Sequence, residues 1–246
     1  GNIVVIGYYA GANASFYDFD PGSLVVNPRL DDNDAYLDAF VAKYTSAGTL
    51  EWVVSAVTGG SIDVRVNNLA IDASGNVVVV GATTGITTEF WDSNSLINVD
   101  GNTLSNGYQA RAYAVKINSQ GELQWGWNYS SGLLFDYTGT TVAIDASGNV
   151  WVAGNEQAGD SHGMIWKLNS AGVLQSTTNL LSSESKIQDL EMDATGNVFV
   201  SGVFYSEVDF DPSGSTNSLT ANADGDAFLA KYNSSLEYQW AQRLTT

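Results

Sequence analysis

Short runs of apolar, mostly β-branched residues recur along this chain, and each run is bounded by glycine. Four of the runs begin with Gly-Asn and end in glycine, at residues 1–7, 75–81, 148–154 and 196–202. Consecutive apolar residues predict strands that are buried on both faces. No segment combines helical periodicity with capping residues at its ends. The pattern therefore predicts an all-β fold.

Two further apolar runs follow each of these strands. The first ends at a lysine or one residue after it, at residues 40–44, 113–117, 164–168 and 228–232, and the second carries Trp52, Trp125 and Trp240 at one position. Asp-Ala-Ser-Gly and similar turns connect the runs, with a left-handed glycine closing each hairpin. We identify four repeats, at residues 1–74, 75–147, 148–195 and 196–246, and predict a four-stranded meander for each.

A meander with two apolar faces cannot bury both faces by itself. Stacking the meanders in a ring buries them, so residues 1–246 are predicted to form one β-propeller, or a fragment of one, with about four blades. A stacked solenoid or a linear array buries both faces as well. Gly1 lies at the second strand of a blade, which leaves fifteen expected strands, one short of four blades. We therefore expect further blades or domains in the same polypeptide, or another segment that supplies the missing strand.

One connection within the repeat differs in length between copies. The segment from Gly-Asn to the repeat lysine covers residues 1–43, 75–116, 148–167 and 196–231, so the third copy is less than half as long as the first. In a meander blade, the connection between the second and third strands lies on the same side as the crossover to the next blade. Variation that is concentrated on one face indicates a ligand-binding face.

The charge balance excludes several classes of partner. The chain has 27 acidic and 9 basic residues, a net charge of −18, and no cysteine. Binding to nucleic acid requires clustered Lys and Arg, so no nucleic-acid partner is expected. No apolar run approaches the roughly 18 residues of a membrane span, so no membrane insertion is expected. An acidic surface is compatible with bound divalent cations.

Several repeated patterns point to a known family. They are Asp-x-x-Gly-Asn-Val-x-Val-x-Gly from residue 72, Asp-Phe-Asp-Pro-Gly from residue 18, Asp-Ala-Phe-Val-Ala-Lys from residue 38 and Gly-x-Leu-x-Trp from residue 48. Over essentially its whole length the chain resembles the SBBP-type β-propeller repeats of bacterial secreted and cell-surface proteins. The resemblance implies a propeller and an extracellular location, and it implies no particular activity. The second repeat lacks Asp-Phe-Asp-Pro, and the third lacks the whole insertion.

Paired aspartates are the candidate metal ligands. Two Asp residues two positions apart on an extended segment point to the same side, and clustered carboxylates are what calcium requires. The candidates are Asp18, Asp20, Asp209, Asp211, Asp224 and Asp226. The alternative is structural: the Asp side chains cap a turn, Pro21 and Pro212 make it rigid, and Phe19 and Phe210 anchor it to the blade.

Candidate ligand-binding residues lie in the variable segments. Tyr17 and the pair Trp91-Asp92 combine aromatic rings with carboxylates, which suits carbohydrate binding, although such loops also pack onto their own aromatic residues. Arg111 and His162 occupy the repeat position that is Asp38 or Asp226 in the other copies. This exchange is explained either by a ligand or by divergence of the repeats.

The string Gly-x-Ser-x-Gly at residues 159–163 matches the nucleophile elbow of hydrolases, but that motif works at a strand-to-helix turn with a distant His. Here it lies between two expected strands, and His162 is the only histidine. We therefore predict no catalytic residues and an extracellular, non-enzymatic module for adhesion, ligand binding or assembly. A glycan or a protein is expected on the loop face, with calcium as a candidate cofactor. The alternative is a polysaccharide-acting hydrolase or lyase that uses paired carboxylates.

Overall fold

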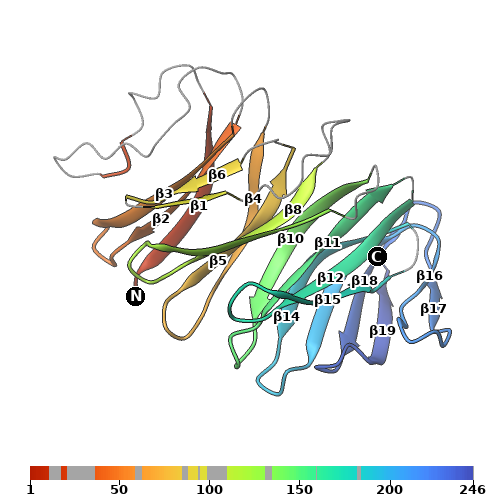
Figure 1. Cartoon of the computed structure of the whole chain (residues 1–246). Coiled ribbons are helices and arrows are strands. Elements are labelled where there is room, and N and C mark those ends of the chain that lie inside the picture. Colours follow the sequence, from red (N-terminus) through yellow and green to blue (C-terminus); the bar gives the residue numbers. More distant parts are fainter. Residues whose placement is uncertain are drawn as a thin grey trace. The chain divides into compact units, whose positions relative to one another are not determined.

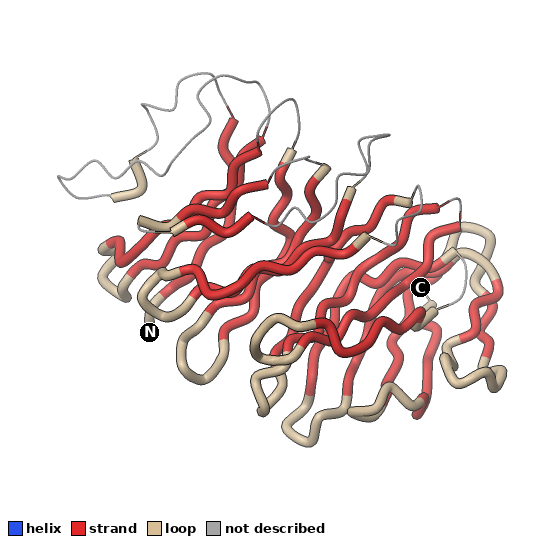
Figure 2. The backbone as a smooth tube through the Cα atoms, viewed as in Figure 1, coloured by secondary structure: helices blue, strands red, loops and turns tan. Residues whose placement is uncertain are grey.

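The computed structural model confirms that the fold is all-β (Figures 1 and 2). It describes residues 1–10, 18–20, 37–58, 63–84, 88–93, 95–98, 110–130, 135–158, 160–181 and 184–245. Within these ranges there are nineteen strands and no helix. Every strand pair is antiparallel, and no sheet closes on itself among the described residues.

The chain divides into two compact units, Gly1–Gly132 and Leu133–Thr246. The first unit contains two sheets. The first sheet has the order β1-β2-β3-β6-β7, with β1 (Ile3–Ala10), β2 (Leu37–Tyr44), β3 (Leu50–Thr58), β6 (Thr88–Trp91) and β7 (Leu96–Asn98). The second sheet has the order β4-β5-β8-β9, with β4 (Val64–Ile71), β5 (Val77–Thr83), β8 (Arg111–Ile117) and β9 (Leu123–Tyr129).

The second unit also contains two four-stranded sheets and a separate hairpin. The third sheet consists of β10 (Asp136–Ile144), β11 (Val150–Ala158), β12 (Asp160–Leu168) and β13 (Leu174–Asn179). The fourth sheet consists of β14 (Ser185–Met192), β15 (Val198–Phe204), β18 (Asp226–Tyr232) and β19 (Tyr238–Leu244). The hairpin pairs β16 (Glu207–Asp209) with β17 (Ser218–Thr220).

The predicted meanders are present in the second, third and fourth sheets, in which consecutive repeat strands are neighbours. The fifteen predicted repeat strands are all found, and the four further strands, β6, β7, β16 and β17, lie in the insertions. The insertion of the second repeat does not form a free loop, because β6 pairs with β3 and so extends the sheet of the first repeat. The register also places Lys43 opposite Trp52.

The predicted aspartate turns are confirmed, and Asp72 shows why the sequence forms them. Its carboxylate accepts hydrogen bonds from the backbone N–H groups of Ser74 and Asn76, both at 2.9 Å, and from the Asn76 side chain at 2.8 Å. Gly75 closes the turn with a φ of 78°, a conformation that costs glycine little. Asp145 and Asp193 make the same bonds in the next two copies of the turn.

In the second, third and fourth repeats, the glycine that follows the apolar run of the Gly-Asn strand is required by close backbone packing. A Cβ atom at Gly81 would overlap the carbonyl oxygen of Arg65 on β4. The register of β4 shifts at this point, between Val66 and Asn68, as expected for a β-bulge. A Cβ atom at Gly154 would overlap the Thr138 carbonyl oxygen, and one at Gly202 would overlap the Lys186 carbonyl oxygen. Any side chain at these glycines would push the first two strands of the sheet apart.

Each unit has its own core between its two sheets. In the first unit, Val54 and Ala56 of the first sheet pack with Val64 and Val79 of the second. In the second unit, Trp151 and Ile165 of the third sheet pack with the apolar residues of the fourth. Burial of β5 on both faces is confirmed, since all its residues are buried. Trp52 also joins two repeats, because its indole N–H donates to the Ser119 carbonyl oxygen at 3.2 Å.

Candidate functional site

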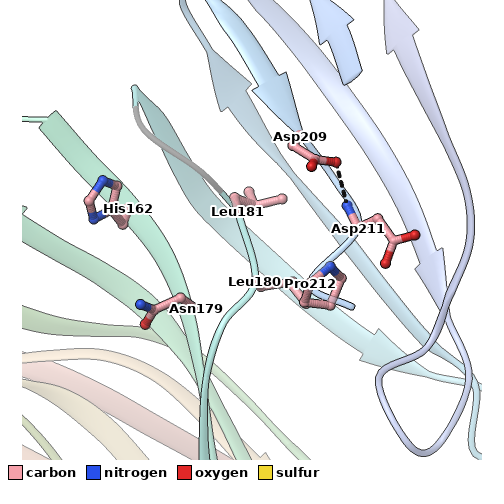
Figure 3. A pocket seen from close by; sticks show the side chains of 7 residues that line it. All are labelled: His162, Asn179, Leu180, Leu181, Asp209, Asp211 and Pro212. Carbon is pink, nitrogen blue, oxygen red and sulfur yellow. Dashed lines mark hydrogen bonds between the residues drawn. The ribbon is translucent and has the colours of Figure 1, made fainter. Parts of the chain in front are cut away.

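The second unit contains a pocket of about 300 Å³ between residues of the third and fourth repeats (Figure 3). It is lined by His162, Asn179, Leu180, Leu181, Asp209, Asp211 and Pro212. Figure 3 shows His162 and Asn179 on one side, Asp209 and Asp211 on the other, and the two leucines between them. The site therefore combines residues predicted as ligand-binding with residues predicted as metal-binding.

The third repeat supplies the side of the pocket that carries His162. This residue pairs with Glu156 near the start of β12. Leu180 and Leu181, which follow β13, lie beside the start of β12. Their N–H groups both donate to the Gly163 carbonyl oxygen, at 2.9 and 3.2 Å. A Cβ atom at Gly163 would press on Ile187 and Leu181, so glycine allows this close return. The start of β12 and the residues that follow β13 thus meet at the pocket.

The fourth repeat supplies Asp209 from the end of β16 and Asp211 from the turn that follows. Asp209 Oδ1 accepts hydrogen bonds from the N–H groups of Asp211 at 3.0 Å and Asn217 at 2.9 Å. Asp211 accepts from the Ser213 N–H and from the Asn217 side chain, both at 2.9 Å. The Ser213 hydrogen bonds, followed by that from Asn217, lower the pKa of Asp211. Both carboxylates therefore stabilise the conformation of the insertion that borders the pocket.

Phe210 anchors this insertion to the fourth sheet. Its ring is completely buried and lies edge-on to Phe204 and Phe228, at centroid distances of 5.6 and 5.0 Å. Its carbonyl oxygen accepts a 2.9 Å hydrogen bond from the Tyr232 hydroxyl. Burial raises the pKa of Tyr232, and the negative charges of Asp211 and Asp209 add to this effect. The hydroxyl thus stays protonated and remains a donor.

The first repeat contains a second copy of this arrangement. Phe19 lies edge-on to Phe40 at 4.6 Å, and the Tyr44 hydroxyl donates to the Phe19 carbonyl oxygen at 2.9 Å. Asp18 Oδ1 accepts the Asp20 N–H at 3.0 Å, as Asp209 does from Asp211. Two copies with the same bonds support the structural interpretation of Asp-Phe-Asp-Pro, in which Asp caps the turn and Phe anchors it.

The remaining metal candidates are not part of the pocket lining. Asp226 accepts hydrogen bonds from the N–H and side chain of Asn222, at 2.6 and 3.2 Å, and lies 3.7 Å from the Arg243 guanidinium. Asp224 is exposed. Across the described ranges, no three His, Asp or Glu side chains are grouped closely enough to hold a metal ion. Calcium binding remains a prediction.

The other ligand candidates lie in the first unit. The Trp91 indole donates to Glu89 at 3.0 Å, and the Asp92 carboxylate accepts bonds from Ser95 and from the Leu123 N–H at 2.8 Å. The bond from Leu123 attaches the β6–β7 hairpin to the start of β9. Arg111 pairs with Thr83 and lies two residues before Tyr113, the partner of Gly81. His162 has the equivalent position in the third sheet, two residues before Met164, the partner of Gly154. Tyr17 lies outside the described residues.

The pocket has a polar rim and an apolar floor. Leu180 and Leu181 are buried and form the floor, while Asn179 is exposed and His162 is half-buried. Within the described ranges, no hydrogen bond joins the His162 ring or the Asn179 amide to another residue. A ligand with one apolar face and several hydroxyl groups fits such a surface.

Sequence reasoning did not identify Asn179, Leu180 or Leu181 as pocket residues. Asn179 ends β13 and the two leucines follow it in the crossover, where no repeated motif marks them. The one available signal was the missing insertion of the third repeat, which leaves this crossover uncovered beside the long insertion of the fourth.

No protein-family model matches this chain, and no curated protein matches it either. The resemblance to the SBBP-type repeats therefore stays a prediction from the sequence. The described part of the chain contains no helix of the length and apolarity that a membrane span needs.

Proposed function

We propose that this chain is an extracellular, non-enzymatic binding module of the β-propeller type, and that its second unit binds a glycan. The observation that supports this function best is the pocket beside His162. Its lining comes from β12 and the residues after β13 in the third repeat, and from the insertion of the fourth repeat.

A single sugar residue suits the size and chemistry of the pocket. Its volume of about 300 Å³ is at the lower end for small-molecule sites. Leu180, Leu181 and Pro212 offer an apolar floor for the C–H face of a pyranose ring. The Asn179 amide, the His162 ring and the carboxylates of the acidic insertion offer hydrogen bonds to its hydroxyl groups.

The propeller arrangement is supported by the meander order of three sheets and by the stacking of sheets within each unit. Strands buried on both faces, such as β5, need a sheet on each side, which a ring of blades provides. The extracellular location follows from the resemblance to secreted bacterial repeats.

Binding is favoured over hydrolysis by the state of the paired carboxylates. A glycosidase needs one carboxylic acid that is protonated at the working pH. The pKa of Asp211 is lowered by hydrogen bonds from Ser213 and Asn217, so this side chain is a poor proton donor. The carboxylates also have a structural task, because they cap the turn that carries Phe210.

Glycan binding is tested with an array of bacterial and eukaryotic glycans, followed by calorimetric titration of the best ligand. We expect saturable binding that Asn179→Ala and His162→Ala weaken about tenfold or more. Thr177→Ala, an exposed position on the same strand β13, is the matched control and leaves binding unchanged. The proposal is wrong if no glycan binds, or if both pocket variants bind as the wild type does. Hydrolysis of a bound oligosaccharide would instead support the enzyme alternative.

A further inference from the structure

The four sheets differ in what covers their outer strands, which we define as the last repeat strand of each sheet: β3, β9, β13 and β19. In the first sheet, β6 pairs with β3. In the second, Asp92, directly after β6, accepts the N–H of Leu123 at the start of β9. In the fourth, β17 lies beside β19, and Arg243 of β19 donates to the Thr220 carbonyl oxygen of β17 at 2.7 Å (Figure 1). Strands of an insertion therefore reach three of the four outer strands.

The outer strand of the third sheet has no such cover. Among the described residues, β13 pairs with β12 and with no other strand. Ala158 at the end of β11 pairs with Asp160 at the start of β12, so no insertion strand separates these two strands. The outer edge of β13 is thus an open row of backbone N–H and carbonyl groups, which is a template for pairing with another chain.

The backbone groups that point to this edge belong to alternate residues. The Leu180 N–H donates to the Gly163 carbonyl oxygen and so continues the ladder between β12 and β13. In an antiparallel pair, every second residue bonds to the partner strand. The residues two and four positions before Leu180 therefore bond to β12 as well. The N–H and carbonyl groups of Gln175, Thr177 and Asn179 point to the open edge.

The side chains of β13 do not protect the edge. Residues 173–181 include no charged residue and no proline, which are common means of blocking a strand edge. In the other three outer strands the residue opposite the repeat lysine is tryptophan, as at Trp52, whereas in β13 it is Ser176. Val173 and Leu174, at the start of the strand, are 56% and 38% exposed. An added strand would cover this apolar surface.

The sequence of β13 is complementary to itself in antiparallel pairing. If two copies of the strand pair with Thr177 opposite Thr177, Gln175 of one copy faces Asn179 of the other. Ser176 likewise faces Thr178. Hydroxyl and amide side chains opposite each other form hydrogen bonds across the strands, and no like charges meet. The strand is therefore suited to its own copy, although the whole chain has a net charge of −18.

We propose that the outer edge of β13 is an interface at which two copies of this chain pair, β13 with β13, about a two-fold axis at Thr177. The backbone groups of Thr177 bond to those of Thr177 in the second copy, and the two third sheets become one continuous sheet. A two-fold interface of this kind uses the same edge on both copies and leaves neither edge open. The backbone supplies the affinity, and the alternate side chains supply the register.

The first test is the association state of the whole chain. Sedimentation velocity between about 1 μM and 1 mM protein should show a reversible equilibrium between monomer and dimer. The negative charge of each copy opposes association, and salt screens this repulsion. We therefore expect a larger fraction of dimer at higher ionic strength. A monomer at every concentration and ionic strength would overturn the proposal.

Charged variants at the axis locate the interface. Thr177 is exposed, so Thr177→Lys and Thr177→Glu should leave the fold intact. Each variant places two like charges opposite each other, and each should dimerise about tenfold more weakly than the wild type. An equimolar mixture of the two should regain the dimer, because opposite charges then meet. Gln124→Lys and Gln124→Glu, at an exposed position on β9, are the matched controls and should dimerise as the wild type does.

Two results with these variants would also overturn the proposal. If Thr177→Lys and Thr177→Glu dimerise as strongly as the wild type, the copies associate through another surface. If the mixture contains no more dimer than either variant alone, Thr177 does not face its own copy. Melting curves of the variants at low protein concentration separate a loss of pairing from a loss of folding.

Discussion

The hydroxyl group of Tyr232 donates a 2.9 Å hydrogen bond to the carbonyl oxygen of Phe210. This bond joins the end of β18 to the middle of the insertion in the fourth repeat, 22 residues away in the chain. The loop that borders the candidate glycan site is thereby held by its backbone as well as by its buried phenyl ring.

Removing this hydroxyl should destabilise the fourth sheet. Because the Phe210 carbonyl would lose a buried partner, we expect Tyr232→Phe to lower the free energy of unfolding by about 1–2 kcal/mol. Tyr44→Phe should have an effect in the same direction through Phe19. Urea denaturation measures both. Tyr205→Phe is the control, since Tyr205 is 48% exposed. Equal stability of all four proteins would show that the bond contributes nothing.

Adding a methyl group at Gly202 should be more damaging. The new Cβ atom would overlap the Lys186 carbonyl oxygen and crowd Phe228, so β14 and β15 would have to separate. We expect Gly202→Ala to cost about 3 kcal/mol or more, at the upper end for overpacked sites. Gly1→Ala has open space around it and should be neutral in the same denaturation experiment. A neutral Gly202→Ala variant would contradict the close strand packing described above.

Asp145 should make the free energy of unfolding depend on pH. Partial burial raises its pKa, but hydrogen bonds from Asn149, Trp151 and Ser147 outweigh burial, and the pKa is lowered in the folded state. The stabilisation by ionised Asp145 is therefore present above the pKa of about 3.9 for an unfolded Asp and is lost as the pH falls through the folded value.

We expect Asp145→Asn to be less stable than the wild type at pH 7 by about 1 kcal/mol. The difference should shrink below about pH 4, where the wild-type carboxylate also becomes neutral. Melting curves between neutral and strongly acidic pH measure it. Asp224→Asn, at an exposed position, is the control for the loss of one negative charge. A difference for Asp145→Asn that does not change with pH would contradict this role of the carboxylate.

Calcium addition and chelation distinguish the two interpretations of the paired aspartates. Hydrogen-bond donors already point at Asp209 and Asp211, so the turn-capping interpretation predicts equal melting temperatures in calcium and in chelator. A bound ion at a hundredfold excess over its dissociation constant would add about 2.7 kcal/mol. A rise of about 5 °C or more with calcium would therefore establish a metal site. Magnesium at the same ionic strength is the control.

The regular part of this fold was predictable because the repeat copies confirm one another. Each Gly-Asn strand, each aspartate turn and the pairing of the repeat lysine with Trp52 or its equivalents recur with constant spacing. The strands β6 and β16 were not predicted. They are four and three residues long, lie outside the repeat pattern, and β6 pairs with a strand of the preceding repeat. Short strands of this kind depend on tertiary contacts that the local sequence does not contain.

The candidate site was predictable only in parts. The sequence singled out His162 for its place in the repeat and Asp209 for its neighbour Asp211, but it assigned them to different ligands. Their approach depends on how the fourth repeat's insertion folds over the crossover after β13. Asp226 was grouped with the same aspartates, whereas the structure uses it to hold Asn222 and Arg243.

The distribution of buried indole rings gives each unit its own spectroscopic signature. Trp151 and Trp166, both in the second unit, are almost completely buried, while the four tryptophans of the first unit are only half-buried. Emission from a tryptophan shifts to longer wavelengths when its surroundings become wet. Unfolding of the second unit should therefore give the larger red shift. Intrinsic fluorescence alone can then report whether the two halves of the chain melt together or one after the other.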